Sequence, residues 1–149
     1  MPDRLVIRAR PSLVLAAAML ESLGLPAADL TDEHLEHFFF AGPDDAPRGL
    51  VGLEICGDDA LLRSLAVSES DRGRGLGSAL VRRAEDYAAA RRVKQIYLLT
   101  TTAEDFFSRL GYSRMDRTEA PVSIQRTSEF AGLCPASAVF MVKRLRGSR

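Results

Sequence analysis

The sequence has no excess charge of either sign, since twenty lysines and arginines balance twenty aspartates and glutamates. A neutral chain has no long-range field that draws it to nucleic acid or to an anionic membrane, so we expect neither as a partner. It also lacks an apolar run of the about 20 residues that a membrane span needs, because Glu21 interrupts the apolar stretch near the N-terminus. We therefore expect neither an export signal nor a membrane anchor.

Cysteine and histidine are scarce as well. Cys56 and Cys134 lie far apart and form no Cys-x-x-Cys or Cys/His pattern, so we expect free thiols in a protein of the reducing cytoplasm. His34 and His37 are the only histidines, and no third ligand lies near them in sequence. The sequence therefore favours a protein without a bound metal.

Length and composition favour one soluble domain over residues 1–149, since 46% of the residues are hydrophobic and 27% are charged. Alternating and helically spaced apolar residues predict strands and helices in mixed order, which indicates an α/β (α+β) fold. The predicted strands lie at 4–10, 37–41, 50–57, 60–67, 94–101, 112–116 and 137–145, and the predicted helices at 12–23, 32–36, 76–88, 103–110 and 121–133.

One strand runs into the longest predicted helix through a loop that is rich in glycine and arginine. Gly73, Gly75 and Gly77 let the backbone approach a ligand closely, and the first amides of the helix lack internal partners. Arg72 and Arg74 add guanidinium groups, which suit phosphate oxygens. The loop lacks the Gly-Lys-Ser/Thr ending of a P-loop and the glycine spacing of the dinucleotide fingerprint. These features predict a loop that binds a diphosphate at a helix N-terminus.

The segment Arg72-Gly73-Arg74-Gly75-Leu76-Gly77 resembles the Arg/Gln-x-x-Gly-x-Gly/Ala signature of the GNAT acyltransferases. The LVGLEI, LLRSLAV and IYLLTT strands and the FFSRLGY segment, which is similar to the family's FYxxxGF, extend the resemblance over nearly the whole chain. It implies a single-domain GNAT fold, with helices on both faces of a mixed central sheet. It also implies that the parallel strands at 65–67 and 95–101 splay apart to form a slot for the cofactor.

The same resemblance implies acetyl-CoA as the co-substrate and no metal. The backbone of residues 65–67 would pair with the pantetheine arm, and residues 72–78 would wrap the diphosphate. The implied cofactor-binding residues are Leu65, Ala66, Val67, Arg72, Gly73, Arg74, Gly75, Leu76, Gly77, Ser78 and Phe106.

Amine attack on a thioester needs a base, a donor for the oxyanion and a proton for the leaving thiolate. The resemblance implies that the backbone N–H of Val67 is the oxyanion donor. The tyrosine that often serves as the acid in the family corresponds here to Phe107, which has no proton to give. Tyr112 or Ser108 as the acid, or departure of the thiolate without one, stay open as alternatives.

The base and the acceptor site depart from the family pattern too. The glutamate that some relatives use corresponds to Leu61, and we expect Glu54 to replace it, with a solvent-facing residue or a structural ion pair as alternatives. Arg63 is a candidate for binding a substrate carboxylate, against a salt-bridge arginine. Thr100 and Thr101, at the end of a strand, are candidates for the acceptor pocket.

Residues 96–143 are similar, more narrowly, to the catalytic domain of bacterial N-acetylglutamate synthases and to small GNAT proteins associated with arsenic resistance. We therefore expect an acetyl-CoA-dependent N-acetyltransferase for the amine of a small amino acid or an analogue, including one that contains arsenic. A non-catalytic acyl-CoA sensor and a protein N-acetyltransferase stay open as alternatives. Residues 121–135 favour a lid over a small acceptor, and a homodimer through the last strands is common in the family.

Overall fold

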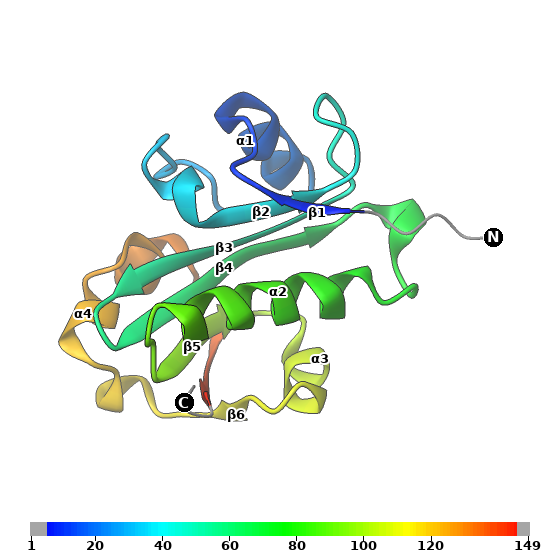
Figure 1. Cartoon of the computed structure of the whole chain (residues 1–149). Coiled ribbons are helices and arrows are strands. Elements are labelled where there is room, and N and C mark those ends of the chain that lie inside the picture. Colours follow the sequence, from blue (N-terminus) through cyan, green and yellow to red (C-terminus); the bar gives the residue numbers. More distant parts are fainter. Residues whose placement is uncertain (1–5, 146–149) are drawn as a thin grey trace. The chain divides into compact units, whose positions relative to one another are not determined.

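The structure is a computed structural model that describes residues 6–145 (Figure 1). The chain divides into two compact units. The first consists of the residues up to 53 together with 64–84, and the second of 54–63 together with the residues from 85 onward. Each unit has a hydrophobic core of its own.

Strands and helices follow one another in mixed order along the chain, as the periodicity predicts. The elements are β1 (Ile7–Ala9), α1 (Leu13–Ser22), η1 (His34–His37), β2 (Phe38–Ala41), β3 (Gly49–Cys56), β4 (Asp59–Val67), η2 (Glu69–Asp71), α2 (Leu76–Ala90), β5 (Gln95–Thr100), α3 (Glu104–Arg109), β6 (Ser113–Arg114), η3 (Arg117–Glu119), α4 (Val122–Gln125), η4 (Glu129–Leu133) and β7 (Val139–Arg144).

In the first unit, β2 pairs antiparallel with β1 and with the start of β3. All four residues of β2 are buried, as its apolar sequence predicts. Phe38 lies opposite Gly52, where a Cβ would stand 2.2 Å from the phenyl ring, so only glycine fits beneath that ring. The N-terminus of α1 is capped by Ser12, whose Oγ accepts a hydrogen bond from the Leu15 amide. The helix then buries Leu20 in the same core.

In the second unit, β5 pairs antiparallel with β7, and β7 with β6. The core of this unit contains Leu61, Tyr97, Ile124 and Phe140. The rings of Tyr97 and Phe140 stack with their centroids 5.5 Å apart. The apolar side chains of β5 that predicted a fully buried strand therefore lie in a core, as expected.

The strands follow the hydrogen-bonded order β1-β2-β3-β4-β5-β7-β6, and β4 with β5 is the one parallel pair among the registers of the described strands. The expected α/β fold with a mixed sheet is confirmed. The parallel register ends at Leu61↔Tyr97 although both strands continue, which agrees with the expected splay. Inside β4, Ser64 has φ 62°, a left-handed conformation that is rare for serine. Such a residue locally interrupts the regular extension of a strand.

The segment predicted as one helix over 121–133 consists instead of α4 and η4. The Oγ1 of Thr127 donates a hydrogen bond to the Ile124 carbonyl and accepts one from the Phe130 amide. Such local bonds by a threonine hydroxyl compete with the helical pattern, which explains the break. The strand predicted over 112–116 is shorter than expected, and residues 4 and 5 of the first predicted strand lie outside the described range. None of the described helices has the length and apolarity that a membrane crossing requires.

Candidate functional site

The N-terminus of α2 has backbone donors without an acceptor in the helix. The first hydrogen bond inside the helix runs from the Ala79 amide to the Gly75 carbonyl at 3.0 Å, so the amides of residues 76–78 have no acceptor within the helix. Gly73 and Gly75 precede them with φ of 78° and 85°, and a Cβ at either position would meet no atom within 4 Å. These glycines serve a left-handed turn with open space beside it, and an anion can reach the amides there.

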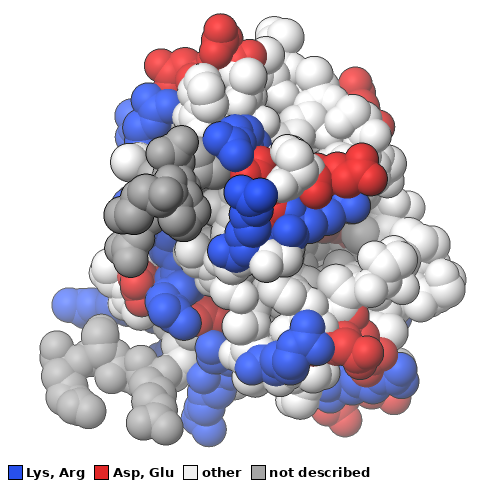
Figure 2. Space-filling model, turned by 90° about the vertical axis from the view of Figure 1, so that its right-hand side faces the viewer, with Lys and Arg blue, Asp and Glu red and all other residues white. Residues whose placement is uncertain are grey.

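Positive charge at this loop is local. Arg72 and Arg74 are exposed, and Arg72 turns back so that its Nε donates a hydrogen bond to the Val67 carbonyl at 3.2 Å. Figure 2 shows basic and acidic side chains side by side on one face of the molecule, as the neutral sequence predicts. A phosphate would therefore be held by the loop and not by a wide basic surface.

The end of β4 offers a second row of backbone groups. The Ser68 amide donates a hydrogen bond to the Arg48 carbonyl at 2.9 Å, on the side of the strand that faces β3. Because successive residues of a strand point their N–H groups to opposite sides, the N–H and carbonyl of Val67 lie on the other edge. Leu65 is half-buried and Ala66 is buried beside it. The edge of Val67 can therefore pair with an extended ligand.

A buried carboxylate that the sequence analysis missed lies directly before this loop. Asp71 accepts hydrogen bonds from Arg48 Nε at 2.9 Å and Arg48 Nη2 at 2.5 Å, and a further one from the hydroxyl of Ser68. These hydrogen bonds, from Arg48 first and Ser68 second, lower the pKa of Asp71 to about 2. Asp71 is therefore charged throughout the neutral range although its side chain is only 5% exposed.

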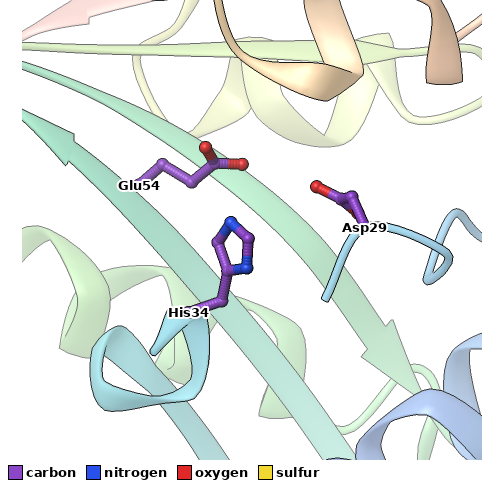
Figure 3. A group of neighbouring side chains, drawn as sticks. All are labelled: Asp29, His34 and Glu54. Atoms are coloured by element: carbon purple, nitrogen blue, oxygen red, sulfur yellow. The ribbon is translucent and has the colours of Figure 1, made fainter. Parts of the chain in front are cut away.

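In the second unit, Arg63 lies between two carboxylates. Its Nη1 donates a hydrogen bond to Glu54 Oε2 at 2.8 Å, its Nη2 lies 3.3 Å from Glu129 Oε2, and no part of its side chain is exposed. Figure 3 shows Glu54 on β3, and it also shows Asp29 and His34, which belong to the first unit. Glu54 and Arg63 therefore form an ion pair with each other. The role of Glu54 as the base and the contact of Arg63 with a substrate carboxylate stay predictions.

Two thiols lie in the second unit and no disulfide joins them. The Cys134 thiol donates a hydrogen bond to Glu129 Oε1 at 3.8 Å. Burial, with the negative charge of Glu129 next in importance, raises the pKa of the Cys134 thiol to about 12. Burial also raises the pKa of Cys56. Since a thiolate is the reactive form, neither cysteine has the environment of a nucleophile.

Tyr112, a candidate acid, belongs to a separate polar cluster in the second unit. Its hydroxyl donates a hydrogen bond to Glu85 Oε2 at 2.9 Å, and Lys143 Nζ donates to both oxygens of Glu85 at 3.0 and 3.1 Å. Lys143 also donates to the Leu110 carbonyl at 2.8 Å. Burial first, and the adjacent Glu85 second, strongly raise the pKa of Tyr112. A tyrosine in this setting gives up its proton less readily than a free one, so the geometry does not favour it as the acid.

Comparison with known families settles the classification. The model of the GNAT acetyltransferase family matches residues 12–112. The chain belongs to the GNAT family. An uncharacterised N-acetyltransferase of Chlorobaculum tepidum is 33% identical over 95 residues, which cover 63% of this chain and 61% of that relative. The match therefore spans less than two thirds of the relative.

Solved GNAT structures show the same fold. One is N-acetylglutamate synthase of Neisseria gonorrhoeae, complexed with coenzyme A and N-acetyl-glutamate. The match covers 98% of this chain and 36% of the synthase chain, with 20% sequence identity and a TM-score of 0.81. The ribosomal-protein-S18-alanine N-acetyltransferase of Escherichia coli matches 98% of this chain and 97% of its own, with 16% identity and a TM-score of 0.66. At these identities the likeness establishes the fold.

The remaining candidates of the GNAT site lie in the second unit. Phe106 is half-buried and meets the buried Phe107 edge to face, with ring centroids 5.1 Å apart. Thr100 is half-buried, and its Oγ1 accepts a hydrogen bond from the Ala103 amide at 3.0 Å, just before α3 begins. Thr101 is exposed. Thr100 therefore has a structural hydrogen bond, while Thr101 remains a predicted acceptor contact.

The sequence candidates divide between the two units. The predicted cofactor residues except Phe106 lie in the first unit, Val67 with them, and the predicted base, acid and acceptor residues lie in the second. Glu54 and Arg63 are in direct contact, while Tyr112 bonds to Glu85. The residues that sequence analysis missed are Arg48, Asp71, Glu85, Glu129 and Lys143, for which no motif gave a signal.

Proposed function

We propose that this GNAT protein is an acetyl-CoA-dependent N-acetyltransferase that acts on the amine of a small amino acid or an amino-acid analogue. The observation that carries the proposal is the row of amides at residues 76–78, open at the N-terminus of α2 behind two left-handed glycines. A diphosphate fits these donors and the nearby guanidinium groups. The coenzyme A in the structure of the gonococcal relative supports the choice of ligand.

The chain's own groups suggest a division of labour in direct transfer. Arg72 and Arg74 bind the diphosphate together with the loop amides, and the N–H of Val67 donates to the oxyanion that forms at the thioester carbonyl. Acetyl-CoA supplies the activated acetyl group. The acceptor ammonium gives one proton to Glu54, and its nitrogen attacks the thioester carbon and forms the C–N bond. The C–S bond breaks and CoA leaves as the thiolate. The nitrogen loses its second proton to water, and water protonates the thiolate after it has left.

Glu54 is a better candidate for the general base than the other residues considered. Its Oε2 is held by Arg63, which fixes the carboxylate, and its side chain is still 15% exposed. Phe107 stands at the position of the family's acid and Leu61 at that of its base, and neither side chain can carry a proton. The hydroxyl of Tyr112 is bound to Glu85. We therefore propose that the thiolate leaves without an acid from the protein, which its modest basicity permits.

The acceptor is the least constrained part of the proposal. The N-acetyl-glutamate bound by the gonococcal relative supports an amino acid, and an arsenic-containing glutamate analogue is the narrower candidate. In the second unit, residues 121–135 are anchored by Ile124 in the core and by Glu129 against Arg63. A fixed segment of this kind supports a bounded site for a small acceptor.

The experiment measures the release of the CoA thiol from acetyl-CoA in the presence of candidate acceptors. These are amino acids, glutamate analogues that contain arsenic or phosphorus, and short peptides. A Gly75→Glu variant places a carboxylate beside the amides of residues 76–78. Gly57→Glu is its matched control, because Gly57, in the turn between β3 and β4, also has a left-handed φ, of 69°. We expect one acceptor class to stimulate release, with loss in Gly75→Glu alone. Binding of acetyl-CoA without release by any acceptor would favour the sensor, and release with peptides only would favour a protein N-acetyltransferase.

A further inference from the structure

The loop that would receive the diphosphate is attached to β3 by one arginine. Arg48, next to the first residue of β3, meets Asp71 through two hydrogen bonds, from Nε to Oδ2 and from Nη2 to Oδ1. Asp71 is the last residue of η2 and stands directly before Arg72. A guanidinium that grips both oxygens of a carboxylate fixes its orientation as well as its distance. The start of the loop is therefore held in one geometry.

Backbone contacts strengthen this attachment. The Arg48 carbonyl accepts a hydrogen bond from the Ser68 amide at 2.9 Å, and the Ser68 carbonyl accepts one from the Asp71 amide, also at 2.9 Å. The hydroxyl of Ser68 donates to the same carboxylate that Arg48 holds. Main chain and side chain of Arg48 thus both hold residues 68–71.

The neighbouring residue positions the other side of the loop. A Cβ on Gly49 would stand 2.8 Å from Leu80 Cδ1 and 2.9 Å from Leu76 Cδ2. Because glycine has no Cβ, the first two turns of α2 pack directly on the start of β3 at this point. Arg48 and Gly49 therefore hold both ends of the glycine loop against one short stretch of backbone.

We propose that Arg48 and Asp71 are a positioning pair that holds the β4–α2 loop in the conformation that receives the diphosphate of acetyl-CoA. The inference rests on the function proposed above. Two glycines with φ of 78° and 85° give the intervening loop many alternative conformations. A loop that must be ordered on binding loses affinity, and a loop ordered beforehand does not. The pair orders the loop without touching the ligand.

The test is calorimetric titration of acetyl-CoA into the wild type, Asp71→Asn, Arg48→Met, Arg48→Lys and the double variant Arg48→Met/Asp71→Asn. We expect the dissociation constant to rise about tenfold in Asp71→Asn and Arg48→Met. The dissociation constant of Arg48→Lys should lie between theirs and that of the wild type, because an ammonium keeps the charge but cannot form the bidentate contact with the carboxylate. The double variant should bind acetyl-CoA no more weakly than the weaker-binding single variant, since the two residues act together.

Two further measurements separate positioning from mere stability. Inorganic pyrophosphate should compete with acetyl-CoA in the wild type, and its inhibition constant should rise in the same proportion in the variants. The matched control is Arg8→Met, which removes the exposed Arg8–Asp44 ion pair of the same unit, 2.7 Å long, and should leave both constants unchanged. All titrations are made well below the thermal midpoint of the least stable variant.

The outcomes distinguish this inference from the function on which it rests. Folded Arg48 and Asp71 variants with wild-type constants for acetyl-CoA and pyrophosphate would overturn the positioning pair and leave the proposed function standing. A wild type that binds no acetyl-CoA would overturn both. If Asp71→Asn fails to fold, Arg48→Lys and Arg48→Met decide, because the Arg48 side chain is 41% exposed.

Discussion

The loop before α2 and the polar clusters of the second unit use charged residues in opposite ways. In the loop, one half-buried ion pair supports a stretch of backbone in which the amides of residues 76–78 have no acceptor within the helix. In the second unit, Arg63 is enclosed by Glu54 and Glu129, and Glu85 is bound by Tyr112 and Lys143. The side chains there bind one another.

This difference separates two kinds of function. A diphosphate can be bound by backbone donors that many sequences supply, provided that glycines allow the turn. Removal of a proton from an ammonium needs a particular side chain, held at a particular place. Glu54 and Glu85 are each held by partners and each have a side chain that is 15% exposed. Of the two, Glu54 is the residue that we propose as the base.

The largest effect is expected from opening the enclosed network. Arg63→Met removes the positive charge that Arg63 places beside the buried Glu129 and the half-buried Glu54, and it should lower the free energy of unfolding by about 3–5 kcal/mol in urea titration at neutral pH. Lys94→Met is the matched control, because its ion pair with Asp58 is 3.6 Å long and mostly exposed. It should change stability by less than about 0.5 kcal/mol. Equal effects of the two substitutions would remove the contrast between the regions.

The next effect concerns the chemistry itself. Glu54→Gln keeps the shape of the side chain but cannot take the ammonium proton, so kcat should fall by about 100-fold while the KM for acetyl-CoA stays unchanged. Glu129→Gln neutralises the other carboxylate on Arg63 and serves as the control. Glu129→Gln should lower the free energy of unfolding but leave kcat near the wild-type value. If the two variants lose kcat equally, Glu54 acts through the ion network and not as a base.

A smaller effect is expected at Tyr112. Tyr112→Phe removes a hydroxyl that donates to Glu85, and it should lower stability by about 1 kcal/mol and kcat by less than about threefold. Tyr97→Phe removes a hydroxyl that donates to Gln95 at 2.5 Å in the same unit and should behave alike. A loss of kcat near 100-fold in Tyr112→Phe alone would instead identify Tyr112 as the acid.

The smallest effect is a pH dependence of the loop's ion pair. Because the pKa of Asp71 is about 2 in the folded chain, below its ordinary value, the pair contributes its full stability above about pH 4 and loses it as the pH falls toward 2. The urea midpoint of the wild type should therefore fall more steeply over this interval than that of Asp71→Asn. Asp44→Asn, in the exposed pair with Arg8, should follow the wild-type curve. Parallel curves for all three proteins would show that the pair contributes nothing.

The sequence predicted those parts of the molecule whose structure depends on the local spacing of glycine and apolar residues. The glycines before the amphipathic helix predicted a loop at its N-terminus, and Gly73 and Gly75 have left-handed φ there. The anion site at this loop stays a prediction. The alternation and apolar runs also predicted the mixed sheet. In these places the local sequence determines the local structure.

The ion networks could not be predicted in this way. Glu54 and Arg63 are close in sequence, but Glu129 reaches Arg63 from a segment whose helix is broken at Thr127, which the periodicity did not indicate. Arg48 and Asp71 likewise come from two separate turns. A partner that is distant in sequence leaves no periodic pattern, so the burial of Arg63 and Asp71 required the structure.

The two shielded cysteines have a practical consequence for enzymology. With the pKa of Cys134 raised to about 12 and that of Cys56 raised as well, the protein carries almost no thiolate at neutral pH. A disulfide reagent that reports free sulfhydryls will react slowly with the folded chain and rapidly with released CoA. Turnover can then be followed continuously on the unmodified protein, with no cysteine-free variant and a low blank, even at high enzyme concentration with slow acceptors.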